Sequence, residues 1–307
     1  MIGIMAKKYL RFILAGFFLF SSTVLLAMPA IVDGKWLIEH AQDDNLLIID
    51  IQPKEYYRQY HVPGAISAPF STWKTGKEGK PPGMMHSIKK TALQLGKLGI
   101  NENNQLVIVA TGTGAGDMAA AARVYWTLKV LGHKQMAILD GGLASYANDF
   151  KGPLSKELTT RKVVTYNPTA DYSIVADSQA VLKASKSNKS LLDARSRGEY
   201  IGVIQGGQYE RAGTIPGAES LPFDWMTINQ SAYMRNKKAI KTLFKSIGAE
   251  QQNDTIHFCH TGNRAALTWF VDYVILEHKN AKLYDASMIE WAIDKSKPVN
   301  VQIKMPK

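Results

Sequence analysis

The stretch that decides the fold is "DTIHFCHTGNRAALTWFVDYVILEH", residues 254–278. It begins with a short apolar run typical of a buried strand, continues through a polar loop that contains a glycine, and ends in an apolar-periodic segment that predicts a helix. An earlier stretch, "QLVIVATGTGAGDMAAAARVYWTLKVLGH" at residues 105–133, follows the same plan. Short strands that alternate with helices are the units of a parallel sheet. The sequence therefore predicts an α/β fold with an internal duplication.

The duplication extends over most of the chain. Three further pairs of segments match: "LLIID" (46–50) with "SLLDARSRGEYIG" (190–202), "HVPGAISAPF" (61–70) with "GTIPGAESLPF" (213–223), and "MAILDGG" (136–142) with "AKLYDAS" (281–287). Self-similarity over this length indicates a repeat of domain size. We therefore expect two domains, each a mainly parallel sheet flanked by helices on both faces.

Composition gives the expected domain boundaries. The segment "GPLSKELTTRKVVTYNPTADY" has two prolines and little apolar periodicity, which indicates a connection. We expect an N-terminal domain over residues 28–155, a linker over 156–172 and a C-terminal domain over 173–307. This length is enough for two domains with separate cores.

Residues 1–27 have the composition of a secretory signal. Lys7, Lys8 and Arg11 precede sixteen uncharged, mostly apolar residues that end at Ala27. That run is shorter than the about 18 residues that indicate a membrane span. We expect cleavage after Ala27 or Ala30, a periplasmic or secreted protein, and no stable membrane insertion after cleavage. An uncleaved N-terminal anchor is the alternative.

The charge of the chain is moderately positive. The formal net charge is +11, and without residues 1–27 it is +8, from 34 basic and 26 acidic residues. The basic residues are scattered, so we expect attraction for small anions and no nucleic-acid partner.

Cys259 is the only cysteine, so the chain cannot form an intrachain disulfide or a zinc site of several cysteines. It lies between the predicted strand and helix, where backbone N–H groups and the helix N-terminus attract anions and favour a thiolate. His260 and Arg264 add positive charge, and Gly262 permits a tight turn. The alternative is that Cys259 only completes a buried strand. The first copy has "ATGTGAGD" where the second has "CHTGNR", so only the second copy can hold a thiolate.

These motifs together resemble the tandem-domain rhodaneses, which are thiosulfate or 3-mercaptopyruvate sulfurtransferases. "CHTGNR" is similar to the family loop Cys-x-x-Gly-x-(Arg/Thr/Ser), "HVPGA" and "GTIPGA" to its paired His-Ile-Pro-Gly-Ala motifs, and "YDASMIEW" (284–291) to its Tyr-Asp-Gly-Ser motif. The resemblance implies an inactive N-terminal domain and a catalytic C-terminal domain. In the latter, Cys259 would form a persulfide inside a substrate-binding loop of His260, Thr261, Gly262, Asn263 and Arg264. Protein phosphatases of related fold need five residues between Cys and Arg, and this loop has four.

The resemblance implies a double displacement. Cys259 would take sulfur from a small anionic donor and pass it to cyanide or a thiol, with no metal and no organic cofactor. A monomer is expected. An exported, non-catalytic module built on the same fold is the alternative of another class.

The choice of donor depends on a few positions. Arg195 matches a family arginine that helps to bind the donor, although it could instead form a structural clip with Asp193. Glu199 replaces a second arginine common in thiosulfate enzymes. Mercaptopyruvate enzymes pair a loop Ser with a His and an Asp, and here Thr261 takes the place of that Ser.

The matching Asp and His are Asp50 and His61, which either assist catalysis or brace the structure. We expect thiosulfate to be the donor, with 3-mercaptopyruvate as the alternative.

Overall fold

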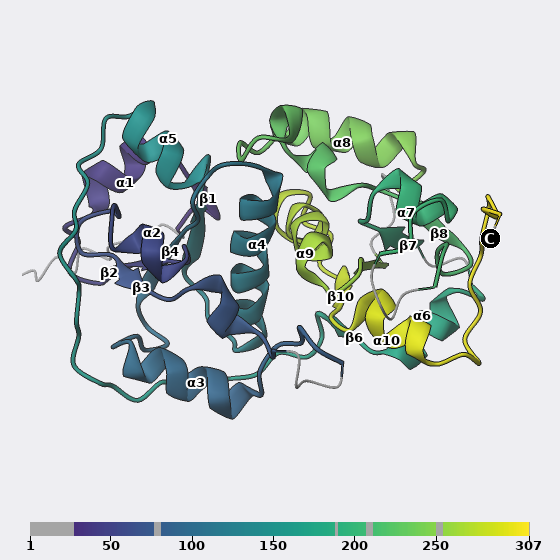
Figure 1. The fold of residues 1–307 in the computed structure, drawn as a ribbon. Helices are drawn as coiled ribbons and strands as arrows, with labels where there is room; N and C mark the ends of the chain where they lie inside the picture. Colours follow the sequence, from purple (N-terminus) through teal and green to yellow (C-terminus); the bar gives the residue numbers. More distant parts are fainter. Residues whose placement is uncertain (1–27, 77–80, 188–189, 207–210, 250–253, 307) are drawn as a thin grey trace, which may run out of the picture.

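The computed structural model describes residues 28–76, 81–187, 190–206, 211–249 and 254–306 (Figure 1). It contains two five-stranded sheets with the strand orders β1-β5-β4-β2-β3 and β6-β10-β9-β7-β8, and every strand pair within them is parallel. Adding five to each strand number converts the first order into the second. The predicted duplication is therefore confirmed at the level of topology. The signal predicted for residues 1–27 lies outside the described residues.

The N-terminal sheet consists of β1 (Ile31–Val32), β2 (Leu46–Asp50), β3 (Ile66–Ser67), β4 (Gln105–Val109) and β5 (Met136–Leu139). Its helices are α1 (Gly34–His40), α2 (Lys54–Tyr57), α3 (Ile88–Lys97), α4 (Ala115–Val130) and α5 (Gly142–Asn148), with a 3-10 turn η1 (Phe70–Trp73).

The C-terminal sheet consists of β6 (Val175–Ala176), β7 (Ser190–Asp193), β8 (Ala218–Ser220), β9 (Thr255–Phe258) and β10 (Lys282–Tyr284). Its helices are α6 (Ser178–Ala184), α7 (Arg197–Ile201), α8 (Lys237–Ser246), α9 (Asn263–Phe270) and α10 (Ser287–Ile293). Two 3-10 turns, η2 (Phe223–Met226) and η3 (Ile228–Gln230), follow β8, and a π-helical turn, η4 (Val271–Ile275), continues α9.

Both faces of each sheet are covered by helices, as predicted. In β4, Leu106 and Ile108 belong to a core that includes α3 and α4, whereas Val107 and Val109 belong to a core that includes α1 and α5. Because successive strand residues point to opposite faces, burial on both faces requires an uninterrupted apolar run. This requirement explains the run "LVIV" that made β4 recognisable in the sequence.

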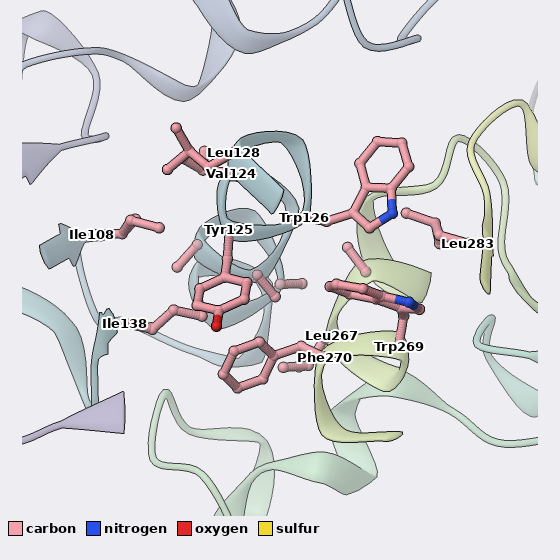
Figure 2. Packing of buried hydrophobic residues seen from close by; sticks show 14 of the residues in the cluster. Ile108, Val124, Tyr125, Trp126, Leu128, Ile138, Leu267, Trp269, Phe270 and Leu283 are labelled. Atoms are coloured by element: carbon pink, nitrogen blue, oxygen red, sulfur yellow. The ribbon is translucent and has the colours of Figure 1, made fainter. Parts of the chain in front are cut away.

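The two domains share one continuous core through α4 and α9, which pack against each other between the sheets (Figure 1). Tyr125 of α4 and Phe270 of α9 meet edge to face, with ring centroids 4.8 Å apart (Figure 2). Trp126 and Trp269 are fully buried in the same cluster. The N-terminus of α9, where the cysteine loop ends, is therefore held against the N-terminal domain.

The predicted linker has no helix or strand between α5 and β6, but it is attached to the N-terminal domain along its length. Glu157 O is hydrogen-bonded to His61 Nε2 at 2.9 Å, the Val164 N–H donates to Gly96 O at 3.0 Å, and the Thr169 N–H donates to Leu131 O at 3.0 Å. Tyr166 is buried in the shared core. Within the described ranges, no helix is both long and apolar enough to cross a bilayer.

Candidate active site

Cys259 directly follows β9, an interior strand of the C-terminal sheet, and precedes α9 by a short loop. The residue is 1% exposed. Its position at the carboxyl end of a parallel strand and near the N-terminus of a helix is where such folds bind anionic ligands. Gly262 is the N-cap of α9 and has a φ of 73°, in the left-handed region that favours glycine.

Ser287 fixes the shape of the Cys259 loop. Its Oγ accepts hydrogen bonds from the N–H groups of Cys259 and Gly262, at 3.0 and 3.1 Å, and donates to Tyr284 O at 2.7 Å. Ser287 itself has a φ of 51°, which is uncommon for a residue with a Cβ. The motif "YDASMIEW" revealed the family resemblance, but it gave no sign that its serine supports the cysteine loop.

Two further donors of the loop, the N–H groups of Thr261 and Asn263, have no hydrogen-bond partner among the described residues. The side chains of these two residues are joined by a hydrogen bond from Asn263 Nδ2 to Thr261 Oγ1 at 3.2 Å. Because two other amides of the loop are engaged by Ser287, an anion on the sulfur of Cys259 would use the amides of Thr261 and Asn263 and the positive end of α9.

Arg264 forms a bidentate ion pair with Glu199. Its Nη1 and Nη2 donate to the two carboxylate oxygens of Glu199 at 2.7 and 2.8 Å. Ser196 and Glu199 also form the capping box that begins α7. Burial opposes ionisation of Glu199, but the donors from Arg264 and Ser196 outweigh it and hold the pKa of this carboxyl at about 2. The Glu199 carboxylate therefore balances most of the positive charge that we expected Arg264 to add to the loop.

Arg195 is a structural clip in this fold. Its Nη2 donates to Asp193 Oδ2 and to Gly213 O, both at 2.7 Å, and its side chain is 1% exposed. Thr214 Oγ1 donates to the same carboxylate at 2.7 Å. Of the two roles that the sequence left open for Arg195, these contacts support the structural clip: the guanidinium joins the end of β7 to the segment before β8.

Asp50 and His61 occupy the positions in the N-terminal domain that correspond to Asp193 and Thr214. Asp50 accepts from the N–H and Nε2 of Gln52 at 2.9 and 2.8 Å. His61 is hydrogen-bonded to Tyr57 O and Glu157 O at 2.5 and 2.9 Å and is stacked on the Tyr57 ring. Within the described residues, no hydrogen bond joins Asp50 or His61 to Thr261 or to the rest of the cysteine loop. Of the two alternatives, the bracing role is the one that these contacts support.

The equivalent loop of the N-terminal domain contains its own anion. Ala110 follows β4 as Cys259 follows β9. The carboxylate of Asp117, in the first turn of α4, accepts from the N–H groups of Gly112 and Thr113 at 3.1 and 2.7 Å. This loop therefore has neither a thiol nor open amides at these positions.

The N-terminal domain also contributes residues to the surroundings of Cys259, which the sequence did not predict. Arg123 of α4 is ion-paired with Asp285, and the Met85 N–H donates to the same carboxylate at 3.0 Å. A Cβ added to Gly83 would lie 3.4 Å from the Cβ of Thr261. These contacts join positions that are far apart in the sequence, and they depend on how the two domains pack.

Comparison with known proteins agrees with this geometry. The model of the Rhodanese-like domain matches residues 33–149 and 178–294. A protein of Mycolicibacterium smegmatis named "Putative thiosulfate sulfurtransferase" is 28% identical over 85% of this chain and 94% of its own length. The "Sulfur carrier protein TtuD" of Thermus thermophilus is 26% identical over 85% of this chain and 93% of its own.

Among solved structures, the 3-mercaptopyruvate sulfotransferase SseA of Escherichia coli superposes with a TM-score of 0.74 at 24% identity, and it covers 85% of this chain and 99% of that one. This similarity concerns the fold. Because the family model covers both halves of the chain, and because the Cys259 loop has the position and form described above, this protein belongs to the Rhodanese-like family of sulfurtransferases, in its tandem-domain form.

Proposed function

We propose that the protein is a thiosulfate sulfurtransferase that works through a persulfide on Cys259. The observation that carries the proposal is the position of this thiol, directly after β9 and beside the free amides of Thr261 and Asn263 at the start of α9. Amides and a helix N-terminus stabilise negative charge on sulfur in the attacking thiolate and again in the persulfide. The same donors can therefore serve both half-reactions.

In the first half-reaction, the Cys259 thiolate attacks the outer sulfur of thiosulfate. A sulfur–sulfur bond forms to Cys259, the sulfur–sulfur bond of thiosulfate breaks, and sulfite leaves with the electron pair. In the second, cyanide or a thiolate attacks the terminal sulfur of the persulfide and restores the thiolate. Each half-reaction balances without an external oxidant or reductant, as in other covalent double displacements.

The residues around the thiol have separate tasks in this scheme. Ser287 holds the loop through the amides of Cys259 and Gly262. The amides of Thr261 and Asn263 receive the terminal sulfur. Because catalytic donors must be preorganised to be effective, the contribution of Ser287 is to keep the loop in one shape.

A second candidate donor is 3-mercaptopyruvate, and the Glu199–Arg264 pair is the observation that favours it. A balanced pair offers less attraction to the doubly charged thiosulfate than a lone arginine would. Two observations support thiosulfate instead. Both ring nitrogens of His61 are engaged by the backbone carbonyls of Tyr57 and Glu157, and the Mycolicibacterium relative is named for thiosulfate.

Steady-state kinetics on the purified chain distinguish these possibilities. Thiosulfate and 3-mercaptopyruvate would be compared as donors, with cyanide as the acceptor and thiocyanate as the product. We expect a higher kcat/KM with thiosulfate and no transfer by Cys259→Ser. A higher kcat/KM with 3-mercaptopyruvate would support the second candidate. A folded protein without activity toward either donor would support a non-catalytic module.

A further inference from the structure

Arg123 is a buried cation with hydrogen-bonding capacity to spare. The residue lies on α4 of the N-terminal domain and is 1% exposed. Its Nη2 donates to Asp285, whereas Nε and Nη1 have no hydrogen-bond partner among the described residues. A buried donor without a partner costs about 1–3 kcal/mol, so an arginine of this kind is unusual unless a ligand supplies an acceptor.

The unpartnered part of Arg123 lies against the Cys259 loop. A Cβ added to Gly262 would overlap Arg123 Nη1, which means that the guanidinium touches the backbone three residues after Cys259. Lys74, also of the N-terminal domain, is half-buried, and its backbone pairs with Met85, whose N–H donates to Asp285. Burial and Arg123 lower the pKa of its amine, and the sulfur of Cys259 raises it. Arg123 therefore lies against the Cys259 loop, and Lys74 is connected to the same place through Met85 and Asp285.

The two arginines of the C-terminal domain that the sequence placed near Cys259 are already paired with carboxylates. Arg264 is paired with Glu199, and Arg195 is paired with Asp193. Arg123 also has a carboxylate partner, Asp285, but this pair engages only one of its three nitrogens. Nε and Nη1 each keep an N–H donor that can give a charge-assisted hydrogen bond to an oxyanion.

We propose that Arg123, with Lys74 beside it, binds the oxyanion head group of the sulfur donor next to Cys259. The N-terminal domain, inactive in itself, then supplies the cations that select the donor. This inference rests on the sulfurtransferase function proposed above. The sulfonate end of thiosulfate and the carboxylate of 3-mercaptopyruvate both present the required oxygens.

Direct binding of anions tests the proposal without turnover. The parent is the full chain with Cys259→Ser, and the probes are thiosulfate, sulfite and pyruvate, titrated by calorimetry. Arg123→Gln alone would leave the Asp285 carboxylate buried and unpaired, so the informative variant is Arg123→Gln combined with Asp285→Asn. Asp285→Asn alone keeps the guanidinium, and Arg58→Gln on the exposed end of α2 is the matched control for a lost arginine.

We expect the double variant to raise the Kd of thiosulfate by roughly 10- to 100-fold, because a charge-assisted contact to an anion is lost. Asp285→Asn should bind thiosulfate at least as tightly as the parent, and Arg58→Gln should not change the Kd. Loss of sulfite binding alone would assign Arg123 to a sulfonate, and loss of pyruvate binding alone would assign it to a carboxylate.

An unchanged Kd for all three anions in a folded double variant would overturn the inference, as would a parent that binds none of them. Arg123-dependent binding in a protein without transferase activity would leave this inference standing and reject the proposed function.

Discussion

Arg264 and Glu199 form a bidentate ion pair, at 2.7 and 2.8 Å, between the first turn of α9 and the capping box of α7. The arginine belongs to the cysteine loop, and the glutamate stands where thiosulfate enzymes of this family often have an arginine. At these two positions, a pair of arginines would carry two positive charges, whereas the Arg264–Glu199 pair is neutral. This difference in charge affects which donor the enzyme accepts.

Replacing Glu199 with Gln should release the charge of Arg264. We expect kcat/KM for thiosulfate to rise by about two- to five-fold, because the partly exposed Arg264 loses its carboxylate partner. The rise for 3-mercaptopyruvate, which has one negative charge fewer, should be smaller. Glu219→Gln on β8, which removes an exposed carboxylate, is the matched control. A fall in kcat/KM for thiosulfate would show that Glu199 itself is needed in the site.

Ser287→Ala should impair catalysis more than folding. Loss of Oγ leaves the amides of Cys259 and Gly262 without their acceptor, and two hydrogen bonds at about 1 kcal/mol each correspond to a roughly 30-fold lower kcat/KM. Ser287→Gly removes the same Oγ but suits the positive φ, so it should melt at a higher temperature than Ser287→Ala while its activity remains low. Near-normal activity in either variant would mean that the loop keeps its shape without Ser287.

Arg195→Ala should destabilise the protein without changing its chemistry. Removal of one partner of a buried pair leaves the Asp193 carboxylate uncompensated, at a cost of about 3–5 kcal/mol. The melting temperature should fall clearly, while kcat/KM of the folded fraction stays within about two-fold, since no contact to the donor is lost. A tenfold loss of kcat/KM with little change in melting temperature would return Arg195 to the donor site.

Asp50 makes the stability of the N-terminal domain depend on pH. Burial raises the pKa of Asp50 from 3.8 to about 6, against the opposing hydrogen bonds from Gln52. The folded state therefore binds the proton more tightly than the unfolded state, and stability from this group is present at low pH and falls as the pH rises through about 6.

Asp50→Asn should remove that dependence. We expect the variant to melt at a higher temperature than the natural protein at pH 8 and at a similar temperature at pH 4. The exposed Asp44→Asn serves as the control. A variant that is less stable at pH 8 would show that the ionised carboxylate is favourable where it stands.

The fold and the position of the cysteine loop could be predicted from the sequence because both have local signals. The apolar runs of β4 and β9 follow from burial on both faces, and the loop of Cys259 follows directly from one of those strands. The signal for a connection over residues 156–172 was also local, because it lay in the composition of that segment. The docking of the segment on the N-terminal domain has no such local signal. The roles of Arg123 and Ser287 depend on packing between segments far apart in the chain, and no local pattern reports it.

The role of Arg195 could not be predicted from the sequence for a different reason. Its motif was visible, but residue type alone does not distinguish a cation that is exposed to a ligand from one that is buried against Asp193. Only the burial of the side chain and its contact with Gly213 O separate the two cases. The same holds for His61, whose partners are two backbone carbonyls.

The central claim is that Cys259 carries the sulfur. Intact-protein mass spectrometry of the chain after brief treatment with thiosulfate, and again after addition of cyanide, tests it most directly. We predict a gain of one sulfur atom that maps to the peptide containing Cys259, disappears when cyanide is added with release of thiocyanate, and does not occur in Cys259→Ser. Thiocyanate formation by a folded Cys259→Ser variant, or turnover in the natural protein without sulfur on Cys259, would contradict the account.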